Sequence, residues 1–324
     1  MPSHTNPAVA KFNHELWTKN VLIDATTEAH SLYLKLKEKG KMVKGRGGTE
    51  IKADPVRKTR LSVSAWNGVN KQNAIEPDIW DIPTHGWTGR ILNLTLKDWD
   101  ELANQGEEQI NDHRQSILDA AKEDWQAALG GDVHVDGSAL EIPLLTGLPG
   151  FVKATTTYGG LDQTQDFWKA NLITGAQYTS NFVTNPYIYI SNLGRLCQHG
   201  SSHDGKNRPD YVLFSRGVYG HVANYLETNF KRVIVQKPKY EYGHETMVID
   251  GYEVDWDINL TADLFYMLNT NFMKWYYQSK VSMDSEDKRV LNPPGTLFQF
   301  RSKHQFVCTS PRHQGKCSTL GVSA

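Results

Sequence analysis

The chain has 324 residues, of which 39% are hydrophobic and 22% are charged, and its 35 basic and 36 acidic side chains give a net charge of −1. These proportions are typical of a globular protein with about two domains, and they exclude a disordered or fibrous chain. A nearly neutral chain also lacks the overall positive charge on which non-specific nucleic-acid binding depends.

Cysteine content and hydropathy predict where the protein resides. The three cysteines are odd in number, do not suggest a disulfide framework, and suit a reducing cytoplasm. The N-terminal sequence has no apolar core of a signal peptide. The longest clearly apolar stretch, Leu264–Leu268, is far shorter than the ~20 residues of a membrane span. We therefore expect a cytoplasmic protein without a membrane segment.

The N-terminal part predicts an arm. His14 to Lys39 is expected to form a short helical or extended terminal arm rather than a core element, and residues 35–60 contain ten basic and three acidic side chains. Alternating residues at 49–52 and 60–66 predict the strands of a projecting β-hairpin. Because an isolated hairpin is marginal in water, its apolar side should pack on a neighbouring copy, and its basic side chains should face an acidic patch. The expected inter-subunit contacts are Lys44, Arg46, Arg57, Lys58, Arg60, Val63 and Trp66.

One long amphipathic helix is predicted next, from Lys97 to about Leu129. Thr95 to Asp98 fits a capping box, and acidic side chains follow in the first turn. Gly130-Gly131 is the expected stop. About thirty residues at 1.5 Å per residue make a spine of ~45 Å. Apolar residues recur on one face at Leu102, Ile110, Ile117, Ala121 and Trp125.

The remainder has the pattern of an α/β region. Thr155 to Asp162 predicts a strand that enters a tight turn at Gly159-Gly160. Residues 209–215 predict a buried strand, followed by a helix from Arg216 to Phe230. Further strands are predicted at Thr246–Ile249, Asp263–Asn269 and Thr296–Thr309.

Two groups of metal-ligating side chains are present. His199, His203 and Asp204 lie in a segment with the composition of a solvated loop, and the glutamate of a metalloprotease helix is missing. In the second group, the order and spacing do not match a structural zinc site, and Cys308 falls in a predicted buried strand. We therefore expect no metal at either group. The members of the second group are His304, Cys308, His313 and Cys317.

Motifs for the common enzyme classes are missing as well. The sequence has no Walker A loop, nucleophile elbow or Rossmann fingerprint. Asp98, Asp100 and Glu101 are explained by the helix dipole. Trp66, Trp80, Trp87 and Trp99 fit packing or interface anchors better than a platform for nucleic-acid bases. We expect a non-catalytic protein without a cofactor. The alternative from another class is a cytosolic metal-dependent hydrolase using His199, His203 and the terminal Cys/His group.

A series of short pieces resembles the major capsid (coat) proteins of tailed bacteriophages, which have the Hong Kong 97-type (Johnson) fold. Each piece is weak alone, and their order along the chain makes the resemblance specific. The pieces are Gly47-Gly48-Thr49-Glu50-Ile51, Trp66-Asn67-Gly68, Asn104-Gln105-Gly106, Gly147-Leu148-Pro149-Gly150-Phe151-Val152, Gly159-Gly160-Leu161-Asp162 before Phe167-Trp168, Pro209-Asp210, Phe265-Tyr266-Met267-Leu268-Asn269-Thr270, and Ser310-Pro311-Arg312-His313-Gln314-Gly315-Lys316.

The resemblance implies an α+β fold with five parts. They are an N-terminal arm (1–40), an extended β-hairpin loop (41–92), a peripheral domain (93–171) with the spine helix 97–130, an α/β axial domain (172–262), and a return to the peripheral domain (263–324). Gln163 stands where many relatives have arginine, which puts an ion pair at that turn in doubt. The residues for an inter-subunit crosslink cannot be matched.

The implied function is structural. Such a protein self-assembles into hexamers and pentamers and closes an icosahedral viral head around double-stranded DNA, without sequence-specific contacts. A separate scaffolding protein and a portal are the expected partners. Assembly is expected in the host cytoplasm, and the final location is the virion capsid. An encapsulin-like nanocompartment shell is the alternative with the same fold.

Overall fold

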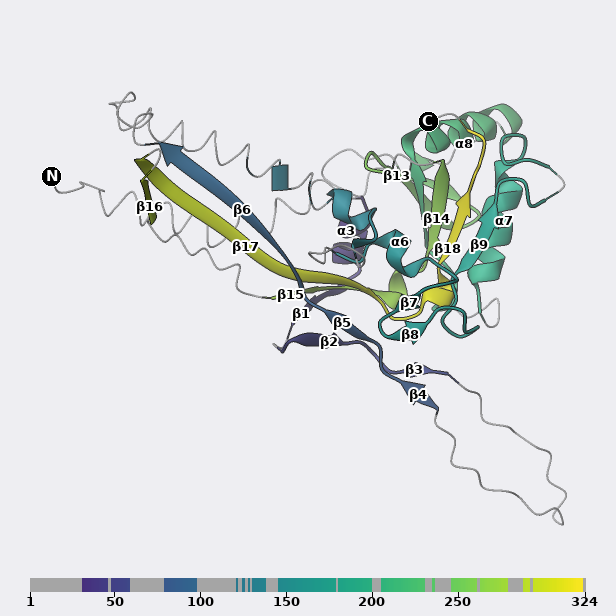
Figure 1. Cartoon of the computed structure of the whole chain (residues 1–324). Coiled ribbons are helices and arrows are strands. Elements are labelled where there is room, and N and C mark those ends of the chain that lie inside the picture. Colours follow the sequence, from purple (N-terminus) through teal and green to yellow (C-terminus); the bar gives the residue numbers. More distant parts are fainter. Residues whose placement is uncertain are drawn as a thin grey trace, which may run out of the picture.

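The computed structural model describes residues 31–45, 48–58, 79–97, 121, 124–125, 128, 130–137, 145–178, 180–199, 205–230, 235–236, 246–260, 263–278, 288–291 and 294–322. These residues form two main sheets with helices packed on them, and a narrow β arm leaves the body (Figure 1). Within the described ranges, no helix is long and apolar enough to cross a membrane.

The first sheet has five strands, and its long member is β17 (Pro294–Cys308). β6 (Thr88–Lys97) pairs with β17 from Thr88 opposite His304 to Lys97 opposite Gly295, so the two form a long antiparallel ribbon (Figure 1). The strand predicted at Thr296–Thr309 is thereby confirmed. The remaining members are β1 (Met42–Lys44), β15 (Met273–Tyr277) and β16 (Lys288–Leu291), and β1 runs parallel to β15.

The predicted start of the spine helix is wrong. Thr95, Leu96 and Lys97 form the end of β6 instead of a helix cap. Pairing with residues 295–297 of β17 satisfies their backbone groups, and this long-range partner overrides the local capping signal. Residues 98–120 of the predicted helix lie outside the described part of the chain.

The predicted end of the helix is also wrong. Gly130 and Gly131 are helical, and the helical residues continue to Val133. Val133 is buried, and Asp132 forms a bidentate ion pair with Arg90 of β6. These contacts hold the last turn in place despite the low helix propensity of glycine. Ala121 and Trp125 are helical and buried, as their spacing predicts.

The second sheet has seven strands in the order β11-β12-β13-β10-β14-β18-β9. β10 (Tyr211–Ser215) is central and buried along its whole length, because both faces of the sheet are covered. The chain continues from it directly into α8 (Arg216–Phe230), so the predicted strand and helix are both confirmed. The other strands are β9 (Asn171–Thr174), β11 (Val235–Gln236), β12 (Thr246–Ile249), β13 (Tyr252–Asp257), β14 (Leu264–Leu268) and β18 (Gly315–Ser318).

The two faces of this sheet belong to two different cores. Val212 and Phe214 pack under α8 and α7 (Pro186–Cys197), whereas Tyr211 and Leu213 point to the other side. That second core also includes residues of the five-stranded sheet, such as Met273 and Phe306. The alternation follows from the period of two of a β-strand. The two sheets therefore share one hydrophobic core.

Helix α3 (Ser31–Glu38) belongs to that shared core. Leu32 and Leu36, one helical turn apart, are almost completely buried. The expectation that residues up to Lys39 form a terminal arm rather than a core element is therefore wrong for residues 31–38. Residues 1–30 lie outside the described part of the chain.

Short elements connect the sheets. β7 (Thr157–Tyr158) and β8 (Leu161–Asp162) form a tight hairpin as predicted, because Gly159 and Gly160 adopt positive φ values of 60° and 80°. The other short elements are α6 (Leu148–Phe151) and the 3₁₀ turns η2 (Thr270–Phe272) and η3 (Pro311–His313).

Candidate functional site

The arm is built from two short strand pairs. β2 (Glu50–Lys52) pairs with β5 (Thr84–Gly86), and further out β3 (Val56–Arg57) pairs with β4 (Trp80–Asp81), both antiparallel (Figure 1). Residues 49–52 were expected to pair with residues 60–66, but their partner is β5. The sequence pattern did not reveal this pairing, because the two strands are more than thirty residues apart.

The outer strand pair presents large apolar side chains to solvent. Trp80 is 56% exposed and Ile82 is 54% exposed. They are two residues apart in an extended segment, so their side chains leave on the same side. Arg57, also exposed, lies opposite Trp80 in the ladder. Large exposed apolar side chains and arginine are the residue types that protein–protein contacts use most.

Three of the seven predicted contact residues lie within the described ranges. Arg57 is on the arm beside Trp80. Lys58 is on the arm as well and pairs with Asp81 at 3.4 Å. Lys44 instead ends β1, opposite Tyr277 in the five-stranded sheet, where its side chain is exposed. The other four lie outside the described ranges: Arg46, Arg60, Val63 and Trp66.

Sequence reasoning missed Ile82 and treated Trp80 only as a general packing or interface residue. The signal was the alternation Trp80-Asp81-Ile82, which places two apolar side chains on one face of an extended segment. Trp87, from the same group of tryptophans, is half-buried and packs against the small cluster of Ile51, Ala53 and Val307.

The base of the arm is anchored firmly to the body. Besides that cluster, the Gln305 side chain donates a hydrogen bond to the backbone oxygen of Gly86 at 3.0 Å, and Thr84 N donates to Gly159 O at 3.0 Å. The ring of His85 packs on Tyr158 at 4.7 Å, and burial lowers the pKa of His85 to about 4. A rigid base fixes the direction in which Trp80 and Ile82 are presented.

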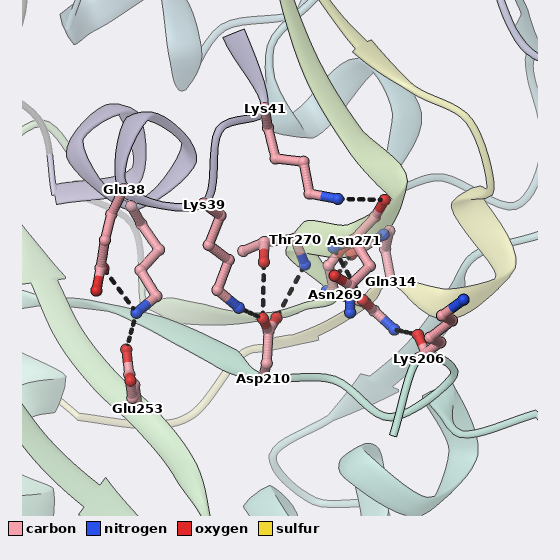
Figure 2. Close-up of polar contacts among 11 residues, drawn as sticks. Glu38, Lys39, Lys41, Lys206, Asp210, Glu253, Asn269, Thr270, Asn271 and Gln314 are labelled. Carbon is pink, nitrogen blue, oxygen red and sulfur yellow. Dashed lines mark hydrogen bonds and ion pairs between the residues drawn. The ribbon is translucent and has the colours of Figure 1, made fainter. Parts of the chain in front are cut away.

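Charged side chains attach α3 to the seven-stranded sheet (Figure 2). Lys35 has only 2% of its side chain exposed and forms ion pairs with Glu38 and with Glu253 of β13. Lys39, just after the helix, pairs with Asp210. Partial burial is the main cause that lowers the pKa of Lys39. These contacts hold the start of the described chain on the body.

Asp210 joins Lys39, after α3, to the connection between β14 and β15, where the chain passes from one sheet to the other. One carboxylate oxygen accepts a hydrogen bond from Thr270 N at 2.9 Å, and the other accepts from Thr270 Oγ1 at 2.7 Å (Figure 2). Thr270 begins η2, which lies between β14 of one sheet and β15 of the other. Asp210 therefore joins α3, the start of β10 and the crossing.

Of the residues considered as metal ligands, the structure brings together His199 and His313, whose ring centroids lie 5.1 Å apart. His203 and Asp204 are outside the described ranges. Among the described residues, no three His, Cys, Asp or Glu side chains are close enough to hold a metal ion. Cys308 is buried in β17, as predicted, and burial raises the pKa of its thiol to about 12. Such a thiol stays protonated and behaves as a small apolar group.

Comparisons with known proteins give structural similarity only. No protein-family model matches the chain, and no curated protein is significantly similar in sequence. The capsid subunit of cyanophage A-1(L) aligns with a TM-score of 0.58 at 12% identity, over 86% of this chain and 90% of that one. The capsid of a native GTA particle aligns with a TM-score of 0.55 at 10% identity, over 89% and 90%.

A third similar structure is the SrpI encapsulin of Synechococcus elongatus PCC 7942, with a TM-score of 0.53 at 8% identity, over 96% of this chain and 95% of that one. The long β6–β17 ribbon, the projecting β arm and the helix-covered seven-stranded sheet are the features described above. From this architecture and these alignments, the chain has the α+β fold of Hong Kong 97-type capsid proteins.

Proposed function

We propose that the chain is the major capsid protein of a tailed bacteriophage or prophage. In this role it is structural and non-catalytic, and it self-assembles into hexamers and pentamers that close an icosahedral head around double-stranded DNA. The observation that carries the proposal is a capsid fold combined with an anchored arm that exposes Trp80, Ile82 and Arg57. The similarity to two capsids over most of the chain supports it.

The arm supplies a contact of the type that closes rings. Its apolar side chains lie on the arm, so the surface that receives them on a neighbour is a different part of the molecule. Such heterologous contacts, repeated around an axis, close into rings. Burying Trp80 and Ile82 removes large apolar surfaces from water, which stabilises the contact.

Charge supports a partner surface on a second copy. Residues 35–60 carry ten basic and three acidic side chains, whereas residues 98–124 carry nine acidic and two basic ones. The basic segment of one copy and the acidic segment of the next are complementary. We therefore expect ring formation to weaken as the salt concentration rises.

The proposal also includes an axial domain, partner proteins and a place of assembly. The proposed axial domain, residues 172–262, contains β10 to β13 of the seven-stranded sheet, and β14 and β18 of the same sheet come from beyond residue 262. The proposed partners are a scaffolding protein, a portal and packaged DNA without sequence-specific contacts. Assembly takes place in the host cytoplasm, and the product is the virion capsid.

The test is electron microscopy of the purified protein, alone and together with a candidate scaffolding protein. Closed shells, or hexamer and pentamer rings, are expected. A protein that stays monomeric or dimeric with scaffolding present would contradict the proposal.

A double variant tests the arm. Trp80→Ala with Ile82→Ser should stop ring formation without changing the circular dichroism spectrum, because both side chains are exposed in the single chain. Leu196→Ser is the matched control, since Leu196 is 45% exposed but lies on α7. If the double variant assembles as well as the control, the arm is not the contact.

The similarity to SrpI encapsulin favours a second candidate, a nanocompartment shell that encloses protein cargo. The two candidates differ in what purified shells contain. Nuclease-resistant DNA of uniform length supports the viral head. A stoichiometric enzyme and no protected DNA support the compartment.

A further inference from the structure

His199 follows the end of α7 and contacts the η3 turn through both ring nitrogens. Nδ1 lies 2.9 Å from a guanidinium nitrogen of Arg312, and Nε2 lies 2.9 Å from the backbone oxygen of the same residue. A guanidinium only donates hydrogen bonds and a carbonyl only accepts them. Nδ1 must therefore accept and Nε2 must donate, so the ring is neutral with its proton on Nε2.

Neighbouring contacts connect this ring to three elements. The side-chain amide of Asn171, at the start of β9, donates to the same Arg312 oxygen at 2.7 Å. α7 packs so closely on β18 that a Cβ atom at Gly315 would lie 2.6 Å from Sγ of Cys197. A change in the protonation of His199 therefore alters the packing where α7, β9 and η3 meet.

The charges around His199 disfavour a proton on Nδ1. Among the described residues, the charged or titratable groups that contact it are Arg312 and His313, both on η3, and the His199 and His313 rings meet edge to face at 5.1 Å. Within the described part of the chain, the polar contacts of the His199 ring are both with Arg312. A second ring proton would point at the Arg312 donors and add a like charge, so the Nδ1 hydrogen bond would be lost.

We propose that His199 is a proton-operated clamp that holds the end of α7 against η3 when neutral and releases it when protonated. Burial, followed by the charge of Arg312, lowers the pKa of His199 below its usual value. The clamp therefore stays closed at neutral pH and opens only when the pH falls below the usual range of histidine titration. It is a property of the single chain, so its test does not depend on shell assembly.

The test is hydrogen–deuterium exchange of the full chain at about pH 7.5 and about pH 5, corrected for the intrinsic pH dependence of exchange. Peptides covering residues 194–199 and 310–314 should exchange about tenfold faster at the lower pH, because the release removes local hydrogen bonds. At pH 5 the buried His85 and His304, each with a pKa of about 4, remain largely neutral.

Two variants separate the clamp from general acid destabilisation. His199→Gln can accept from Arg312 and donate to its backbone oxygen without taking up a proton, so both peptides should exchange slowly at both pH values. His199→Lys carries a permanent charge and should exchange fast at both. If wild type shows no acceleration, or if His199→Gln accelerates as much as wild type, the clamp is refuted.

Discussion

Gln314 and Asn269 hold the two crossings between the sheets together through a reciprocal pair of hydrogen bonds. Oε1 of Gln314 accepts from Asn269 N at 2.7 Å, and its Nε2 donates to Asn269 O at 3.2 Å (Figure 2). Both residues are completely buried. Asn269 lies in the connection from β14 to β15, and Gln314 lies in the connection from β17 to β18. The Gln314 side chain therefore joins the two connections between the sheets.

Replacing Gln314 with Met should destabilise the fold strongly. Met fills a similar volume but leaves the buried Asn269 N–H without its partner, which costs about 1–3 kcal/mol, whereas Asn269 O keeps the hydrogen bond from Phe272 N. The free energy of unfolding in urea measures the loss. Gln165→Met, at an exposed position, is the control and should change stability by less than about 0.5 kcal/mol. Equal effects of the two substitutions would contradict the proposed role of the pair.

Lys35 should be far more sensitive to substitution than Lys37 in the same helix. Lys35→Met leaves Glu253, which is 25% exposed, without its buried partner, and we expect a loss of about 1–3 kcal/mol. Lys37 is exposed, so Lys37→Met should change the unfolding free energy little. Adding Glu253→Gln to Lys35→Met should recover part of the loss. A double variant that shows no coupling would mean that the pair does not stabilise α3.

Two buried histidines should make stability fall in acid. Burial lowers the pKa of His85 and of His304 to about 4, and the charge of Arg90 adds to the effect at His304. The unfolded chain, with histidine pKa values near 6.5, takes up these protons first as the pH falls. The stability from each ring is therefore present above about pH 6.5 and is lost towards pH 4, at about 1.4 kcal/mol per pH unit.

His304→Phe tests this slope. Phe can keep the stacked contact with Trp275, whose ring lies 5.5 Å from that of His304, but it cannot take up a proton. The unfolding free energy, measured at pH 7, 6 and 5, should then fall less steeply with decreasing pH than in wild type. The difference in slope corresponds to the one proton that His304 takes up on unfolding. Parallel pH profiles for the two proteins would show that His304 does not titrate on unfolding.

Gln163 should matter for the stability of the β7–β8 hairpin because its side chain joins the turn to the end of α6. It is completely buried, donates to Phe151 O at 2.8 Å and accepts from Thr156 Oγ1 at 2.8 Å. Gln163→Leu leaves the Phe151 oxygen unpaired and should cost about 1–3 kcal/mol. Thermal unfolding of this variant, compared with Gln165→Leu, measures the effect. An unchanged melting temperature would mean that another group satisfies that oxygen.

Local sequence patterns predicted those elements whose conformation is determined by residues within the same segment. The strand predicted at 209–215 is observed at 211–215, and the following helix has its predicted boundaries, because an apolar strand and a change of period are visible within the segment itself. The Gly159-Gly160 turn was predicted for the same reason, since only glycine adopts such φ values readily. The division into domains and all seven expected inter-subunit contacts, Val63 and Trp66 among them, stay predictions.

Only the tertiary structure decided the features that depend on distant partners. Thr95 to Lys97 form a strand because they pair with β17. β2 pairs with β5. Leu32 and Leu36 are core residues because they pack in one cluster with side chains from both sheets. The alternation Trp80-Asp81-Ile82 indicates a shared face but not its exposure, and the pairing of Gln314 with Asn269 has no local signature. By itself, the sequence determined backbone preferences and periodicity, whereas burial and pairing depend on which distant segments the fold brings together.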